Sequence, residues 1–250
     1  RSIGGEDLEM VLEEVVQTVG GNSKTADLVN QILGGYRAGE SVADAFGAAM
    51  RRILEPFDFC VADAADPQLK AVSAPLLQEA VKSFRDHERI LTERSTALED
   101  AGFHPQVAVM EDGVNLFAHF DGTRERLYWR DDGFAARGLR QRYTEAELLQ
   151  EIEKSPGDFS PNVLLRPVVE SYVFPTLAYV GGPGEIAYFA QVTALFGAVG
   201  IEPPIVYPRF SGLVVEPKVE RLLGEIDLDI EAAMRPREEL MDELARREMP

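Results

Sequence analysis

A glycine-rich loop that leads into a helix is the part of the sequence best suited to hold a ligand. The run Thr176-Leu-Ala-Tyr-Val-Gly-Gly-Pro-Gly-Glu-Ile-Ala-Tyr-Phe-Ala-Gln191 joins a short apolar segment to three glycines, a proline and an amphipathic pattern. Gly181, Gly182 and Gly184 lack a Cβ, so they permit a tight turn and let the backbone approach a ligand closely. The loop predicts ligand contact through backbone amides, with a plain turn between strand and helix as the alternative.

Glu185 decides which ligand this loop can accept. Its carboxylate falls in the first turn of the predicted helix, where it suits the helix dipole but repels an anion. A sugar or an ammonium group is therefore expected at the loop rather than a phosphate. Glu185 can take a proton from an attacking amine as a general base, and a helix-start carboxylate without a catalytic role is the alternative.

Two arginines are candidate clamps for a carboxylic acid, because a guanidinium pairs with a carboxylate through two parallel hydrogen bonds. Arg209 follows a predicted strand at its carboxyl end, and Arg166 precedes Pro167 in an apolar segment. An internal glutamate would also satisfy such an arginine. Asn162 and Tyr188 can supply hydrogen bonds or a wall for a sugar ring, although each such residue alone is more often a core or capping residue.

Composition narrows the possible partners. The formal net charge of the 250 residues is −18, and no basic stripe is interleaved with aromatic residues, which argues against nucleic acid and anionic membranes as partners. Cys60 is the single cysteine, so no internal disulfide or cysteine-based metal site forms, and its apolar surroundings predict a buried, inert thiol. The three histidines show no ligand spacing, and no metal site is predicted. Without a signal peptide or a long apolar run, the expected location is cytoplasmic.

Several segments together carry a resemblance to a known family. They are Ser160–Pro167, Pro175–Gln191 and Val206–Arg209, with similar patterns in Ser41–Phe46, Asp66–Lys70, Gly102–Val107, Asn115–Phe117 and Ala245–Pro250. The sequence resembles the bacillithiol biosynthesis enzymes, the cysteine ligases that add cysteine to glucosaminyl malate. The resemblance covers nearly all of the chain.

The family's architecture implies that this chain is an internal piece. Family members carry an N-terminal Rossmann-like half before the position of Arg1 and a long coiled coil that begins near Pro250. The resemblance implies a homodimer assembled through that coiled coil in the full-length parent. For this chain it implies a monomer or a weak dimer, with apolar surface left uncovered.

Apolar periodicity and turn residues then predict the elements that position the loop. Helices are expected within 6–55, from Asp66-Pro67 onward, over 86–102 and after Thr144, whose partner Glu147 completes a capping box. Strands are expected at 57–62, 106–110, 115–120, 125–130 and 134–137, the last four forming a meander with Asp-Gly turns at 112, 121 and 132. A helix from about Pro161, a strand to Val180, a helix over 185–199 and a strand over 204–207 complete the pattern.

The predicted fold class is α/β: a Rossmann-like, mainly parallel sheet with flanking helices and an inserted antiparallel β subdomain. The predicted division is a helical layer at 1–56, a first part of the core at 57–85, a connecting subdomain at 86–158, a second part of the core at 159–215 and C-terminal helices at 216–250. In this arrangement the loop, Glu185, Arg166 and Arg209 line one cavity, with Asn162 and Tyr188 at its margins.

The resemblance implies an amide bond between the carboxyl group of cysteine and the amine of glucosaminyl malate. A free carboxylate must first be activated, usually as an acyl phosphate or adenylate, so ATP is a possible cofactor. The sequence has no recognisable nucleotide loop, and the cofactor is unknown at this stage. Two alternatives remain: a sugar-binding or glycosyltransferase-like module, and a non-catalytic scaffold. Binding of glucosaminyl malate without consumption of cysteine would favour the first alternative, and absence of binding would favour the second.

Overall fold

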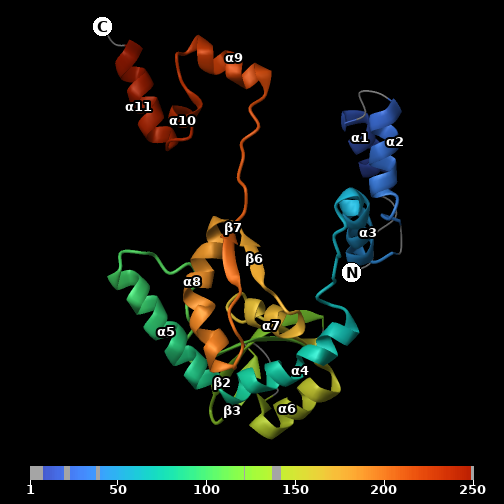
Figure 1. Cartoon of the computed structure of the whole chain (residues 1–250), viewed down its shortest axis with the longest axis vertical. Coiled ribbons are helices and arrows are strands. Elements are labelled where there is room, and N and C mark those ends of the chain that lie inside the picture. The colour runs from blue at the N-terminus through green and yellow to red at the C-terminus, as the bar shows by residue number, and fades with distance from the viewer. Residues whose placement is uncertain (1–7, 20–22, 38–39, 121, 137–141, 249–250) are drawn as a thin grey trace.

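The computed structural model describes residues 8–19, 23–37, 40–120, 122–136 and 142–248. Its first helices are α1 (Leu8–Val19), α2 (Ser23–Leu33) and α3 (Val42–Leu54). They pack against one another and stand apart from the central body (Figure 1). The main hydrophobic cluster draws no described residue from this region, since it begins at Ala74.

The central body is built on an antiparallel sheet. Its strands are β1 (Gly113–Phe120), β2 (Thr123–Arg130), β3 (Gly133–Ala136), β4 (Arg142–Tyr143) and β5 (Phe159–Pro161), in the spatial order β4-β3-β2-β1-β5. The helices α4 (Pro67–Lys82), α5 (Phe84–Asp100) and α6 (Glu145–Lys154) pack around it. Leu77, Leu116 and Phe134 are fully buried between these helices and the sheet, so their apolar side chains hold the layers together.

A second, parallel pair of strands carries the glycine loop. The strands β6 (Ala178–Gly181) and β7 (Ile205–Pro208) are joined through α8 (Pro183–Ala198), and α7 (Arg166–Val173) precedes them. The inner face of α8 belongs to the same apolar cluster as the first sheet. The two strands nevertheless expose large apolar side chains, with Val180, Ile205 and Tyr207 at 60%, 73% and 63% exposure. This pair therefore presents uncovered apolar surface.

The prediction of a mainly parallel sheet is wrong for the described residues. Five of the seven strands are antiparallel, and only β6 and β7 run parallel. The strand predicted at 57–62 does not form. A short 3₁₀ helix, η1 (Glu55–Phe57), leads to an irregular segment, and Phe57 and Phe59 are both about two-thirds exposed. Cys60 lies in this segment and is exposed, so the prediction of a buried thiol is also wrong.

The strand predicted at 106–110 is replaced by a segment bound to a side chain. The backbone of Val107 donates to Oε1 of Gln191 at 2.9 Å, and its carbonyl accepts from Nε2 of the same amide at 2.9 Å. Gln191 is completely buried in α8. Its amide group therefore takes the place of a neighbouring strand in satisfying the backbone of this segment.

Several predicted helix starts and turns are confirmed. Asp66 caps α4 through the amides of Gln68 and Leu69, and Thr144 forms a capping box with Glu147 at α6. The hairpin predicted between β2 and β3 also forms, but its turn lies at Asp131 and Asp132 rather than at Asp132-Gly133. Both residues have positive φ (49° and 61°), as a two-residue hairpin requires. Asp121 and Arg137 of the predicted meander lie outside the described residues.

The C-terminal region follows an extended segment after β7. It contains α9 (Pro217–Glu225), α10 (Ile230–Ala233) and α11 (Arg237–Glu248), which stand apart from the central body (Figure 1). Across the part of the chain that is described, no helix combines the length and apolar character needed to cross a membrane.

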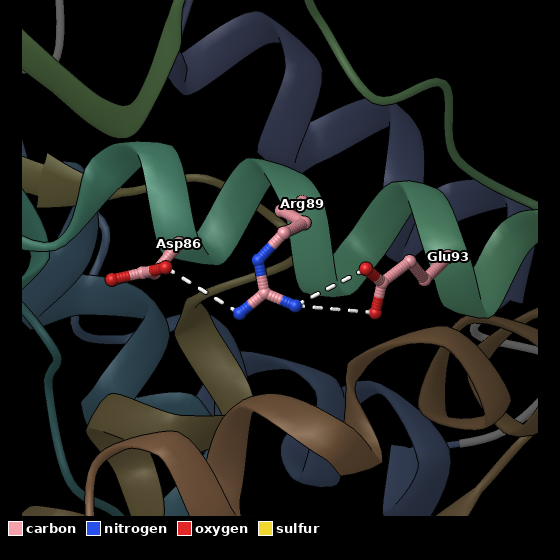
Figure 2. A network of polar contacts seen from close by, with 3 residues as sticks. All are labelled: Asp86, Arg89 and Glu93. Carbon is pink, nitrogen blue, oxygen red and sulfur yellow. Dashed lines mark hydrogen bonds and ion pairs between the residues drawn. The ribbon is translucent and has the colours of Figure 1, made fainter.

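The charged pattern at 86–102 belongs to the exposed face of α5. Arg89 donates to Glu93 at 3.1 Å and to Asp86 at 3.4 Å (Figure 2). The hydrogen bonds that Arg89 donates to Glu93 and then to Asp86 raise its pKa. Because all three side chains are exposed, this network keeps the face solvated and contributes little to stability.

The burial of His87, on the inner face of α5, predicts that the stability of the fold depends on pH. His87 is 1% exposed, and its Nδ1 has no partner among the described residues. Burial lowers its pKa below that of the unfolded chain, so the unfolded state takes up the proton first as the pH falls. We expect the free energy of unfolding to decrease below about pH 6.5, by at most about 1.4 kcal/mol per pH unit. Denaturant titrations of the wild type and His87→Gln should differ in this slope, and equal slopes would contradict the assignment.

Candidate functional site

The glycine loop lies where β6 and β7 end together. The strands pair Val180 with Tyr207 and Gly181 with Pro208, and the amide of Arg209 donates to the carbonyl of Gly181 at 2.7 Å. The loop and Arg209 are therefore fixed to each other through the backbone. The carboxyl ends of parallel strands are where α/β proteins commonly bind ligands.

Glu185 is held by two hydrogen bonds at the start of α8. Oε2 accepts from the amide of Gly182 at 2.7 Å, and Oε1 accepts from the hydroxyl of Tyr179 at 2.8 Å. The bond from Gly182, then the bond from Tyr179, and the nearby charge of Arg209 lower the pKa of Glu185. The carboxylate is consequently ionised, and the Gly182 amide is engaged by it rather than open to a ligand.

The side chain of Arg209 lies close to Gly182. A Cβ at position 182 would lie 2.7 Å from Nη2 of Arg209 and 3.4 Å from Oε2 of Glu185. The guanidinium and the carboxylate thus flank the same small residue, although their charged atoms form no ion pair. Gly184 differs, because a Cβ there would meet nothing within 4 Å. A side chain at 182 would therefore displace the guanidinium of Arg209, whereas one at 184 would meet open space.

Two tyrosines, Tyr179 and Tyr188, lie next to Glu185. The hydroxyl oxygens of Tyr179 and Tyr188 lie 3.4 Å apart, and the Tyr179 ring packs on Phe189 with 4.5 Å between centroids. Burial first, then the bonds to Tyr188 and Glu185, raise the pKa of Tyr179. Tyr179 is therefore a neutral phenol that donates to Glu185 and fixes the direction of its carboxylate.

Asn162 lies elsewhere, in the interior next to β1. It is 2% exposed; its Nδ2 donates to Oδ1 of Asn115 at 2.8 Å, and its Oδ1 accepts from the amides of Leu164 and Leu165, each at 3.0 Å. These contacts account for Asn162 as a residue that turns the chain from β5 into α7. The structure does not bring it to the loop.

Arg166 lines a cavity that is separate from the glycine loop. It is exposed at the first position of α7 and lines a space of about 100 Å³ between α4, β5 and α7. That cavity includes neither the glycine loop nor Glu185 nor Arg209. The structure thus brings together Gly181, Gly182, Glu185, Tyr188 and Arg209. Arg166 lines the other cavity, whose Glu170 is close enough to Glu185 for their charges to interact.

The cavity beside Arg166 also contains charged residues that sequence reasoning missed. Lys70 and Glu170 line it, and Arg124 reaches its rim by donating from Nε to Oγ of Ser160 at 3.0 Å. These residues come from α4, α7 and β2, far apart in the sequence. The one available signal was that Lys70 closes a segment that carries the family resemblance.

Comparison with known proteins identifies close similarity to one family. Residues 1–210 match the family model described as "Bacillithiol biosynthesis BshC, N-terminal Rossmann-like domain". The expectation that the family's N-terminal Rossmann-like half lies before Arg1 is therefore wrong, because the match places that domain within residues 1–210. Proteins named "Putative cysteine ligase BshC" are 38% identical over 97% of the chain in Koribacter versatilis, 33% over 81% in Salinibacter ruber and 28% over 89% in Bacillus cereus. The matched regions make up 45%, 37% and 41% of those relatives, so the chain spans less than half of their length.

Proposed function

The chain belongs to the BshC family of bacillithiol biosynthesis, and we propose that it serves the step in which cysteine is joined to glucosaminyl malate. The bond formed is an amide between the carboxyl group of cysteine and the amine of the glucosamine unit. The observation that supports a site at the glycine loop is that Glu185 and Arg209 flank Gly182 there. Glu185 is suited to an amine and Arg209 to a carboxylate.

The geometry supports distinct roles for these two residues. Arg209 is exposed next to the loop and can pair with a carboxylate of the malate unit. Glu185 is ionised and oriented by Tyr179, so it can contact the amine and accept its proton as the amide forms. Gly181, Gly182, Gly184 and Tyr188 border the sugar in this proposal. Asn162 has no part in this proposal, because it is buried against Asn115 and away from the loop.

Activation of the cysteine carboxylate needs a further reactant. Amide formation from a free carboxylate is unfavourable in water, and transfer of a phosphoryl or adenylyl group would supply the driving force. We propose ATP as the donor to test, and we assign no residue to its binding. In solution the chain is proposed to be a monomer or a weak dimer, which sedimentation at several concentrations would check.

Replacing Arg209 with Ala is expected to weaken the binding of glucosaminyl malate about 10- to 30-fold, or by about 1.5–2 kcal/mol, because a charged hydrogen bond is lost. Arg209→Lys keeps the charge but loses the paired geometry, and we expect an intermediate affinity. Calorimetric titration measures both effects.

Arg221→Ala is the matched control, because Arg221 is an exposed arginine on α9, outside the loop. It should leave the affinity unchanged. An Arg209→Ala variant that folds normally and binds as tightly as the wild type would remove Arg209 from the site.

A further inference from the structure

The cavity between α4, β5 and α7 has a charge arrangement that the proposed reaction at the loop does not use. Its volume is about 100 Å³, and Lys70, Ser73, Ser160, Arg166 and Glu170 provide its polar lining. The chain as a whole carries a net charge of −18, so a local excess of cations stands out against it.

The cations gather around β5. Nζ of Lys70 donates to the carbonyl of Phe159 at 2.7 Å, and this single bond leaves further N–H groups of the ammonium for a ligand. Arg124 donates to Ser160 and to the carbonyl of Pro161. The guanidinium of Arg166 makes no hydrogen bond or ion pair to any other described side chain. Burial, followed by repulsion from Arg166 and Arg124, lowers the pKa of Lys70.

A carboxylate lies within the same cavity. Glu170 follows Arg166 by one turn of α7, yet the two side chains do not form an ion pair. Burial raises the pKa of Glu170, the charge of Arg166 opposes that rise, and the charge of Glu185 adds to it. The cavity thus presents positive groups on Lys70 and Arg166 together with a separate negative group. A dianion such as a dicarboxylate would meet repulsion from Glu170.

The rest of the lining is apolar. Leu69, Val169, Val173 and Phe174 form walls beside the charged groups. A ligand that matches all of these features has a carboxylate, an ammonium group and a short, weakly polar side chain. A free α-amino acid has this chemistry.

We propose that this cavity binds a small zwitterionic α-amino acid, with its carboxylate at Lys70 and Arg166, its ammonium group at Glu170 and its side chain against Val169 and Val173. The identification of that amino acid as cysteine rests on the proposed function. The cavity would then hold the second substrate, while the glycine loop holds the first.

The test uses three thiols that differ by one charged group. Calorimetric titration of the chain with L-cysteine should show saturable binding, with a Kd in the millimolar range or tighter. 3-Mercaptopropionate lacks the amine and cysteamine lacks the carboxylate, and each should bind at least about tenfold more weakly, because one charged contact is lost.

Variants test which residue contacts the ammonium end of the ligand and which contacts its carboxylate end. Glu170→Gln should weaken cysteine about tenfold and leave 3-mercaptopropionate unchanged, whereas Lys70→Met should weaken both. Glu153→Gln, an exposed change on α6, is the control and should alter neither. Thermal unfolding of each variant verifies that it is folded.

Two results would overturn the proposal: folded wild-type chain that shows no saturable binding of cysteine, or equal affinity for cysteine and 3-mercaptopropionate, which would make this an anion site only. The titrations contain neither glucosaminyl malate nor a nucleotide, so cysteine binding can hold even if no amide is made. Conversely, amide formation with an unchanged KM for cysteine in Glu170→Gln would reject the cavity and retain the proposed function.

Discussion

Replacing Glu185 with Gln is expected to lower turnover of cysteine and glucosaminyl malate about 100-fold while leaving the affinity for glucosaminyl malate nearly unchanged. Gln keeps an acceptor for the Gly182 amide and a polar group for Tyr179, so the loop should keep its shape. It loses the ability to take a proton. The effect is placed at the lower end of the range for a general base because the lowered pKa makes Glu185 a weaker base.

Steady-state kinetics measures turnover and calorimetry measures the affinity for glucosaminyl malate, both on the same preparations. Glu202→Gln, an exposed change on the segment between α8 and β7, serves as the control and should alter neither. If Glu185→Gln lowers the free energy of unfolding but not turnover, the carboxylate serves only to cap α8. Equal losses of binding in Glu185→Gln and Arg209→Ala would likewise remove the general-base role.

Replacing Asn162 with Ala is expected to destabilise the fold by about 2–4 kcal/mol. The change leaves Oδ1 of Asn115 and the amides of Leu164 and Leu165 without their partner in the interior, and each unpaired buried group costs about 1–3 kcal/mol before relaxation. The loss is measured by denaturant unfolding.

A double-mutant cycle with Asn115→Ala tests whether the two side chains act as a pair. The combined loss should be smaller than the sum of the single losses, because either change breaks the same hydrogen bond. Asn162→Ala with unchanged stability but weakened binding of glucosaminyl malate would contradict the structural role and return Asn162 to the substrate site.

Local signals in the sequence predicted the parts of the fold that depend on neighbouring residues. The caps at Asp66 and Thr144, the charged face of α5 and the succession from β6 through α8 to β7 are all of this kind. Capping, helical periodicity and glycine turns depend on a few residues on either side, so one sequence suffices to recognise them.

Long-range pairing could not be read in the same way. The apolar run at 57–62 has the composition of a buried strand, but its Phe57 and Phe59 are exposed and no described strand pairs with it. At 106–110 the backbone groups of Val107 are satisfied by Gln191, 84 residues away. The antiparallel contact of β5 with β1 also joins distant segments. Nothing in local composition encodes these partners.

The proximity of the loop, Glu185 and Arg209 was predicted from the succession of strand, glycine loop, helix and strand. Gly182, Glu185 and Arg209 meet because β6 and β7 end side by side. Arg166 has an apolar sequence setting yet is exposed, since it opens α7 rather than lying inside it. The charged cavity of Lys70 and Glu170 could not be predicted, because it depends on how α4, β5 and α7 pack.

Product analysis tests the central claim most directly. The protein is incubated with L-cysteine, glucosaminyl malate and ATP, and the mixture is analysed by mass spectrometry beside a parallel reaction with Glu185→Gln. The account predicts a cysteinyl amide of glucosaminyl malate in the wild-type reaction and a strongly reduced amount in the variant. Tight binding of glucosaminyl malate with all cysteine unchanged would contradict it, and would assign the glycine loop to sugar binding without ligation.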